Sequence, residues 1–304
     1  MSITWEVIAW RCGRAYRRGM ATTMTSGFTR PIGDLLREWR ERRRLSQLAL
    51  ALDAEVSTRH LSFLETGRAR PSREMVLRLA ERMDIPLRER NTMLLAAGFA
   101  PVYPERDLDD PALRAARRAV DLVLDGHKPY PAHAVDRYWT LVASNHLARP
   151  LLAGIAPELL EPPINVLRLS LHPEGLAPQI TNLGQWRAHI LHRLRQQVES
   201  SADPMLDALL TELAGYATPD DEGADEPLRD LYESGIVVPL RLRTAWGMLA
   251  LFSTITIFGT PVDVTLSELA IEAFFPADEA TGEILRRIAE DPTVPHSPGL
   301  RRPF

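Results

Sequence analysis

The sequence has one cysteine, no long apolar run and none of the common nucleotide-binding or nucleophile motifs. Cys12 alone can form neither an internal disulfide nor a cysteine metal site, which is typical of a reducing compartment. The richest apolar run, residues 247–258, contains one serine and two threonines and is shorter than the about 18 residues of a membrane helix. No P-loop, G-x-G-x-x-G or G-x-S-x-G pattern occurs. We therefore expect a globular cytoplasmic protein with no membrane contact, no cofactor and no enzymatic activity.

Charge is distributed unevenly along the chain. The formal net charge is −4, but residues 1–29 carry 4 basic and 1 acidic side chains, residues 30–98 carry 14 and 10, and residues 99–304 carry 18 and 29. Because neutralised phosphates supply most non-specific affinity for nucleic acid, this asymmetry favours contact between the front of the chain and a polyanion. Two unrelated solvated surfaces would give the same asymmetry.

The spacing of apolar residues predicts a domain of five short helices over residues 30–99. Apolar residues recur at i, i+3, i+4 and i+7 from Ile32, and again from Val76. Ser46 and Ser57 stand at the N-cap positions of the second and third helices, where a hydroxyl accepts a hydrogen bond from a free backbone N–H. The first domain is therefore all-α.

A second domain of the α+β class is predicted over residues 111–290, after a linker at residues 100–110. Residues 1–29 are expected to be a disordered extension, and residues 291–304 a flexible tail. Within the second domain we expect helices at 111–124, 183–199 and 204–216, a strand or hairpin passing into a helix over 134–152, strands at 165–171, 236–243, 247–258 and 264–274, and an acidic loop at 220–226.

Residues 45–71 have the pattern of a phage-repressor type helix-turn-helix. The residues that fit are Leu45, Ser46, Gln47, Leu50, Ala51, Val56, Ser57, Leu61, Ser62, Glu65, Gly67 and Pro71. On these residues the segment resembles the XRE family of transcriptional regulators, over most of residues 32–86. The resemblance implies that the third helix enters the major groove of double-stranded DNA.

The third helix divides into two faces at about 100° per residue. The arc away from the core carries Thr58, Arg59, Ser62 and Phe63, whereas Leu61 and Leu64 point inward. An arginine can pair with guanine O6 and N7, and an aromatic ring can contact a thymine methyl, so Arg59 and Phe63 are suited to base edges. Phe63 would also fit a core position.

The resemblance places further side chains against backbone phosphates. Gln47, Arg68 and Arg70 are expected there, although the two arginines would also fit an ordinary charged surface. His60 lies between the two faces of the helix and suits either a phosphate contact or packing. The full predicted DNA-binding set is Gln47, Thr58, Arg59, His60, Ser62, Phe63, Arg68 and Arg70.

Two pairs of residues in this domain are expected to affect its folding and not its DNA contacts. By the resemblance, Arg40 and Glu65 form a partly buried ion pair between the first and third helices, with no role in DNA contact. Breaking such a pair leaves an uncompensated charge. Arg44 and Glu55 stand in the two inter-helix turns, where the family commonly has glycine, so these turns must take non-glycine or strained conformations.

The chain as a whole resembles the MmyB-like group of these regulators. The stretches that carry the resemblance are residues 59–68, 96–101, 136–139, 143–145, 165–173 and 253–261. It implies a PAS-like sheet around an apolar pocket for a small hydrophobic, fatty-acid-like ligand, although the pattern alone fits a filled core equally well. The expected wall residues are Tyr138, Trp139, Asn145, Trp186, Phe252 and Phe258. Each would also fit the core, and Asn145 would also fit a helix cap.

Signals for catalysis or metal binding are weak. His189 and His192 are three residues apart on a helix, but no cysteine or H-E-x-x-H arrangement accompanies them. Glu268 and Glu272 are expected on one exposed face of a strand.

Taken together, the two resemblances lead us to expect a homodimeric, ligand-responsive regulator of a pseudo-palindromic operator. The alternatives are a protein-interaction module, such as an antitoxin or sigma-factor partner, and an enzyme fused to a DNA-binding domain.

Overall fold

The computed structural model describes residues 30–217, 238–259 and 261–291. The chain divides into two compact units, one of Met1–Asp107 with Thr260–Ser267 and the other of Leu108–Gly259 with Glu268–Phe304. The extension predicted over residues 1–29, the acidic loop at 220–226 and the tail beyond residue 291 lie outside the described residues.

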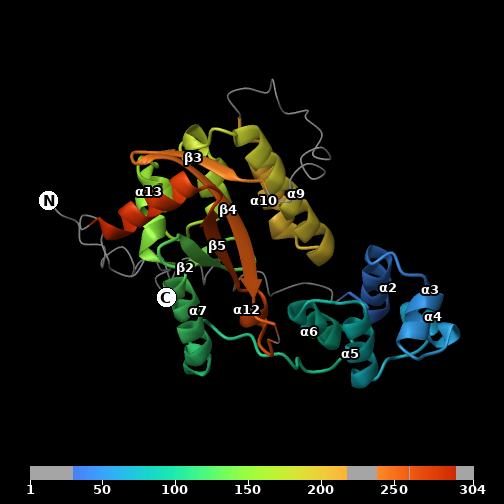
Figure 1. The fold of residues 1–304 in the computed structure, drawn as a ribbon. Helices are drawn as coiled ribbons and strands as arrows, with labels where there is room; N and C mark the ends of the chain where they lie inside the picture. Colours follow the sequence, from blue (N-terminus) through green and yellow to red (C-terminus); the bar gives the residue numbers. More distant parts are fainter. Residues whose placement is uncertain (1–29, 218–237, 260, 292–304) are drawn as a thin grey trace. The chain divides into compact units, whose positions relative to one another are not determined.

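The first unit is helical, as the apolar spacing predicts (Figure 1). Its helices are α2 (Ile32–Arg42), α3 (Gln47–Asp53), α4 (Thr58–Glu65), α5 (Arg73–Arg82), α6 (Leu87–Ala96) and α12 (Val264–Ser267). The hydroxyls of Ser46, Ser57 and Ser72 accept hydrogen bonds from backbone N–H groups in the first turns of α3, α4 and α5. Each cap satisfies a donor that the helix itself leaves free.

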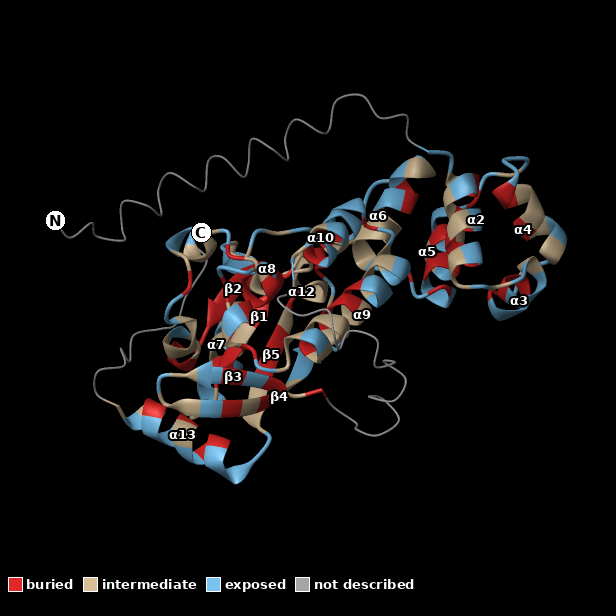
Figure 2. Ribbon diagram, turned by 90° about the horizontal axis from the view of Figure 1, so that it is seen from above, coloured by how far each residue is buried: buried red, intermediate tan, exposed pale blue. Residues whose placement is uncertain are grey.

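The core of the first unit is formed where α2, α3, α4 and α5 meet, and its centre is fully closed to solvent. Figure 2 shows the buried positions of these helices in red and their solvent faces in blue. Leu36, Leu50, Leu61, Leu64 and Leu79 have no exposed surface. Complete burial of one such side chain is worth about 1.5–3 kcal/mol, so the inward stripes of the helices supply much of the stability of the unit.

The tight packing of α2 on α4 requires a glycine at position 33. A Cβ added to Gly33 would lie 2.6 Å from the carbonyl oxygen of Leu64 and 2.7 Å from that of Glu65. By contrast, the turns after α2 and α3 are made without glycine, because Arg44 and Glu55 both adopt a φ of 55° in the left-handed region. Such residues cost about 1–3 kcal/mol each, which the packing of the neighbouring helices must offset.

The segment of residues 260–267, which connects two strands of the second unit in sequence, belongs to the first unit. Asp263 is buried and accepts a hydrogen bond from Arg106 Nη1 at 3.0 Å. The backbone N–H of Val264 donates to the carbonyl of Pro104, and the Thr265 hydroxyl donates to the carbonyl of Arg106. These bonds hold α12 to the chain that follows α6.

The second unit is built around a five-stranded antiparallel sheet with the order β2-β1-β5-β4-β3. Its strands are β1 (Ala132–Val135), β2 (Leu141–Ser144), β3 (Leu240–Thr244), β4 (Gly247–Ile257) and β5 (Ala270–Pro276). Its helices are α7 (Arg114–Gly126), α8 (Val166–Leu171), α9 (Leu183–Ser201), α10 (Pro204–Ala214) and α13 (Glu279–Glu290), with 3-10 turns η1 (Pro111–Leu113), η2 (His146–Leu152), η3 (Pro157–Leu160) and η4 (Ala177–Gln179).

The two faces of the sheet support separate apolar clusters. Helices α9, α10 and α13 share a cluster with Leu240, Leu242, Leu249 and Leu251. Helix α7 packs on the other face, in a cluster that includes Ile271. Because β1, β2 and β5 are covered on both sides, most of their positions are buried, as Figure 2 shows. The predicted α+β class is confirmed.

Two predicted strands are wrong in whole or in part. Residues 166–171 form helix α8 and not a strand, because the Asn165 side chain caps it by accepting hydrogen bonds from the N–H groups of Leu167 and Arg168. In the predicted strand at 264–274, residues 264–267 are helical, and β5 begins only at Ala270.

Candidate functional site

Helix α4 presents one polar face and one buried face, as its sequence predicts. Leu61, Leu64 and Glu65 are buried, whereas Arg59 is exposed and Phe63 is half-buried. The other predicted contact residues, Thr58, His60 and Ser62, are half-buried, and Arg68 and Arg70 are exposed just beyond the helix. The predicted set therefore forms one surface, apart from Gln47 on α3.

The predicted ion pair between α2 and α4 is present and buried. Arg40 Nε donates to Glu65 Oε1 at 2.6 Å, and Arg40 Nη2 donates to Glu65 Oε2 at 2.9 Å. The side chains of Arg40 and Glu65 are only 10% and 2% exposed. Gln47 Nε2 also donates to Glu65 Oε2, at 2.8 Å. One N–H of the Gln47 amide is thus engaged inside the unit, and its second N–H and its oxygen remain for other partners.

Phe63 lies between two arginines of the polar face. The guanidinium of Arg59 lies 5.3 Å from the centre of the Phe63 ring, and that of Arg68 lies 5.9 Å from it. Cation–π contacts of this kind are worth about 0.5–1 kcal/mol at exposed sites. Phe63 is not part of the apolar core cluster of the unit. The ring therefore holds two cations at the position where the sequence predicts contact with DNA.

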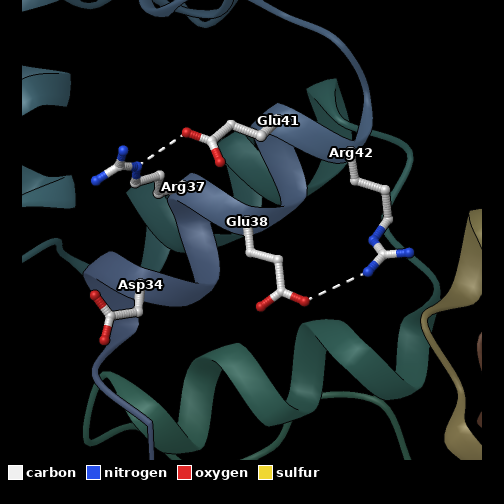
Figure 3. Close-up of a pocket in the computed structure, with 5 residues that line it drawn as sticks. All are labelled: Asp34, Arg37, Glu38, Glu41 and Arg42. Carbon is white, nitrogen blue, oxygen red and sulfur yellow. Dashed lines mark hydrogen bonds and ion pairs between the residues drawn. The ribbon is translucent and has the colours of Figure 1, made fainter.

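A shallow hollow on the outer face of α2 has a different character (Figure 3). It is lined by Asp34, Arg37, Glu38, Glu41 and Arg42. Arg37 pairs with Glu41 at 2.9 Å, and Arg42 pairs with Glu38 at 3.4 Å, one helical turn apart in each case. Exposed ion pairs of this type contribute little to stability, and because their charges offset each other they leave no strong electrostatic potential to attract a ligand. The hollow is a solvated charged surface.

The second unit contains an apolar cavity of about 110 Å³. Its walls come from both α8 and α9 and from the face of the sheet toward α9, and they include Leu169, Trp186, Ile190, Leu240 and Leu251. The cavity is smaller than the roughly 300–1,000 Å³ of sites for drug-sized ligands. As it stands it can hold a group of only a few heavy atoms, so a longer ligand requires the walls to move apart.

Of the six wall residues expected from the sequence, only Trp186 lines this cavity. Tyr138 and Trp139 belong to the apolar cluster of α9, α10 and α13 but do not line the cavity. Phe252 stacks on Phe275, and Phe258 packs in the cluster on the α7 face of the sheet. Asn145 is buried within the fold, where its side chain bonds the N–H of Ala132 and the carbonyls of Leu124 and Tyr130. Its side chain makes no cap bond to the following turn.

The charged and ionisable residues that line the cavity meet at Glu272. Arg193 Nη1 donates to Glu272 Oε1 at 3.0 Å, His133 Nε2 lies 3.2 Å from Glu272 Oε2, and the Ser253 hydroxyl donates to Glu272 Oε1 at 3.0 Å. Burial alone would raise the pKa of Glu272, but the hydrogen bond from His133 and the charge of Arg193 outweigh it and lower the pKa to about 2. Glu272 is therefore an ionised carboxylate inside the fold.

The expectation that Glu268 and Glu272 share an exposed face is wrong. Glu272 is 4% exposed, because β5 is covered on both faces. Glu268 precedes the strand, and its carboxylate pairs with Arg137 at 2.8 Å. Arg137 also pairs with Asp203 at the start of α10. The two glutamates thus belong to separate ion networks and cannot act as an acid and base pair.

The two helical histidines do not converge on a shared site. His189 stacks on Trp186, and burial together with the nearby charge of Arg193 lowers its pKa. The His192 ring contacts Gln196 instead. Over residues 30–217, 238–259 and 261–291, no group of three or more histidine, cysteine or acidic side chains is placed to hold a metal ion.

Arg193 and His133 were missed by reasoning from the sequence, although Arg193 left a signal. Trp186, Ile190 and Arg193 follow one another at i, i+4 and i+7 along α9, so an arginine stands on an apolar stripe. A charged residue in that position is buried only with a partner. His133 has no comparable local signal.

Comparison with known proteins identifies two regions of the chain. Residues 116–288 match the family described as "MmyB-like transcription regulator ligand binding domain", and residues 31–93 match a family described as "Helix-turn-helix domain". Both are regulatory families rather than enzyme families. No curated protein matches the chain.

Among solved structures, one similar chain is titled "Structure of an RNA-binding Light-Oxygen-Voltage Receptor". It is 13% identical, with a TM-score of 0.24 over 95% of this chain and 69% of that one, a likeness too weak to carry an argument. No helix within the described part of the chain is both long and apolar enough to cross a membrane.

Proposed function

The chain belongs to the family of MmyB-like transcription regulators, and on this premise we propose that it is a sequence-specific regulator whose affinity for its operator responds to a small hydrophobic ligand. The helix-turn-helix unit makes it a DNA-binding regulator. The proposal concerns the side chains that read DNA, the ligand, and the assembly that connects them.

The reading side chains are proposed to be those on the polar face of α4. Arg59 is exposed on this face and its guanidinium is held near the Phe63 ring, so it can donate two parallel hydrogen bonds to a guanine edge. Arg68 and Arg70 follow α4 and suit phosphates, which position the domain without selecting sequence. Phe63 then acts mainly by orienting Arg59 and Arg68.

The DNA proposal is tested by titrating the full-length protein against its own upstream region at several salt concentrations. Arg59→Ala should reduce the free energy of operator binding by about 1–3 kcal/mol and relax the sequence preference at one base position. Arg68→Ala should weaken binding to all DNA sequences similarly and lower the slope of log affinity against log salt concentration by about 1. Arg118→Ala, an exposed arginine on α7, serves as the control and should leave both quantities unchanged. Unchanged affinity and base preference in Arg59→Ala would show that α4 does not read the sequence.

The ligand is proposed to occupy the cavity beside Trp186 and Ile190. The support is the combination of apolar walls with one polar corner at Glu272, which suits a fatty-acid-like molecule with an apolar chain and a polar end. We consider two conformations of the regulator, only one of which binds the operator well. A ligand that binds one of these conformations more tightly shifts the affinity of the regulator for its operator, by at most the difference between the two ligand-binding free energies.

The ligand proposal is tested by native mass spectrometry and thermal shift with a panel of acyl compounds. Ala148 lines the cavity, so Ala148→Phe should fill it and abolish the shift. Ala115→Phe places the same ring on an exposed position of α7 and should bind as the parent does. No stabilisation of the parent by any compound would count against a ligand at this site.

We further propose that the protein acts in the cytoplasm as a homodimer on a pseudo-palindromic operator. Helix-turn-helix proteins of this type place two recognition helices in successive major grooves, so the half-sites should lie about 34 Å apart, one helical turn. Analytical ultracentrifugation, followed by footprinting on operators with altered half-site spacing, tests both statements. A monomer that protects a single half-site would contradict them.

A further inference from the structure

The polar corner of the cavity, formed by Arg193, Glu272 and His133, determines what kind of ligand head group it can take. The three side chains come from α9, β5 and β1 and all line the cavity. Their exposed fractions are 20%, 5% and 13%, so a ligand group placed here is largely removed from water. Burial of an unpaired charge at such a position carries a large desolvation penalty.

Glu272 already compensates the positive charge of Arg193. Glu272 is ionised and Arg193 is positively charged, and the two are in direct contact at 3.0 Å. A ligand carboxylate placed beside Arg193 would therefore also lie beside the carboxylate of Glu272 and would compete with it for the same guanidinium.

Hydrogen-bond donors nevertheless remain free in the corner. Of the Arg193 guanidinium, only Nη1 has an acceptor among the described residues, and the group lies 4.3 Å from the centre of the Trp139 ring. Glu272, in contrast, already has three partners in Arg193, His133 and Ser253. The corner can thus donate further hydrogen bonds but offers little capacity to accept them.

We propose that the cavity selects an uncharged acyl ligand, whose polar end is the carbonyl of an amide, ester or lactone, over the free carboxylate of the same chain. The carbonyl oxygen accepts hydrogen bonds from the free N–H groups of Arg193 and leaves the pair with Glu272 intact. A carboxylate would bring a second negative charge beside Glu272 and would compete with it for Arg193. This inference rests on the proposed binding of an acyl ligand in the cavity.

The test compares octanamide with octanoate, which have the same chain and differ mainly in the charge of the head group. Binding to the full-length protein is measured by calorimetry at about pH 8. Octanamide should bind at least tenfold more tightly. In Glu272→Gln the negative charge is gone while Arg193 remains, so octanoate should gain affinity and the preference should reverse.

Glu268→Gln is the matched control, because Glu268 pairs with Arg137 and does not line the cavity. It should retain the preference for octanamide. If Glu272→Gln does not fold, Arg193→Met provides a second test, since loss of the donors should weaken octanamide binding and remove the selectivity.

The outcomes separate the two proposals. Equal or tighter binding of octanoate by the parent protein would overturn the selectivity while leaving ligand binding in place. Binding of neither compound, nor of any acyl compound in the wider panel, would overturn both. Octanamide selectivity that survives Glu272→Gln would also overturn the inference, because its cause would lie elsewhere.

Discussion

Neutralising Glu65 should destabilise the first unit more than any exposed charge change on α2. Its carboxylate accepts hydrogen bonds from Arg40 at 2.6 and 2.9 Å and from Gln47 at 2.8 Å, and its side chain is 2% exposed. Glu65→Gln preserves the shape but leaves the buried Arg40 guanidinium with only the carboxylate of Glu41, 3.6 Å away and half exposed, as a counter-charge. Removal of one partner from such a pair costs about 3–5 kcal/mol, a large part of the 5–15 kcal/mol that stabilises a typical protein.

Removal of both charges should cost much less than removal of one. In the double variant Arg40→Met/Glu65→Leu no charge remains, and the apolar side chains fill a similar volume. The remaining losses are two hydrogen bonds, from Arg40 Nη1 to the carbonyl of Leu45 and from Gln47 Nε2 to Glu65, each worth about 1 kcal/mol. The two single substitutions should therefore be strongly non-additive, with a coupling free energy of roughly 3 kcal/mol or more.

Urea unfolding followed by circular dichroism gives the overall stabilities, and hydrogen exchange of peptides from α2 and α4 assigns the loss to the first unit. Glu38→Gln is the control on the same helix, since Glu38 is 36% exposed and pairs with Arg30 and Arg42 rather than with Arg40, and it should behave much as the parent does. Additive effects of Arg40→Met and Glu65→Leu would show that the pair is not coupled and would refute the reasoning.

Three other substitutions test the fold and the cavity. Gly33→Ala should destabilise the first unit by about 1–3 kcal/mol, because its Cβ would meet backbone atoms at 2.6–2.7 Å, whereas Gly184→Ala on α9 meets nothing within 4 Å and should be neutral or stabilising in the same melts. Glu272 has a folded-state pKa of about 2, below its ordinary 4.5, so its contribution of roughly 3 kcal/mol should be present above about pH 4.5 and lost as the pH falls toward 2; a Glu272→Gln variant with the same acid profile as the parent would contradict this. Asn165→Ala removes the cap of α8 and the bond to the carbonyl of Tyr138 and should cost about 1 kcal/mol or more, and Asn165→Asp, which can restore only the cap bonds, should recover only part of this loss.

The first unit could be predicted in detail from the sequence because its determinants are local. The two faces of α4 follow from a spacing of three and four residues, and the caps at Ser46 and Ser57 act on N–H groups three residues away. The partner of Glu65 was identified by resemblance, because nothing in the local spacing connects positions 40 and 65. The structure supplies the reason, since the close approach at Gly33 brings α2 against α4.

Short apolar segments of the second unit could not be assigned from periodicity. In residues 166–171, Arg168 and Ser170 alternate with leucines, so the local pattern favours a strand although the segment is helical. The decisive interactions are made by Asn165, whose oxygen caps α8 while its nitrogen donates to the carbonyl of Tyr138. The second of these contacts depends on the tertiary fold.

Of the six residues predicted as ligand-site walls, only Trp186 lines this cavity, because the prediction favoured large aromatic residues. Strand alternation already separates Phe252 from its neighbour Leu251, and the two point to opposite faces of β4. Large rings fill space, so Phe252 and Phe258 complete the packing on the α7 side. A cavity remains where smaller aliphatic side chains such as Leu251 and Ile190 meet around a polar group that has to be accommodated.

Two arginine–glutamate pairs in this protein, Arg40–Glu65 and Arg193–Glu272, differ in how many N–H donors of the arginine have no acceptor within the described structure. Arg40 uses Nε, Nη1 and Nη2, two of them toward Glu65 and one toward the carbonyl of Leu45, so it has little capacity for a further partner. Arg193 uses only Nη1 toward Glu272, and its side chain is one of those that line the cavity. Because both pairs are neutral overall, their charge does not distinguish them, whereas their free donors do. The first pair is therefore suited only to joining helices, and the second can also bind an uncharged acceptor.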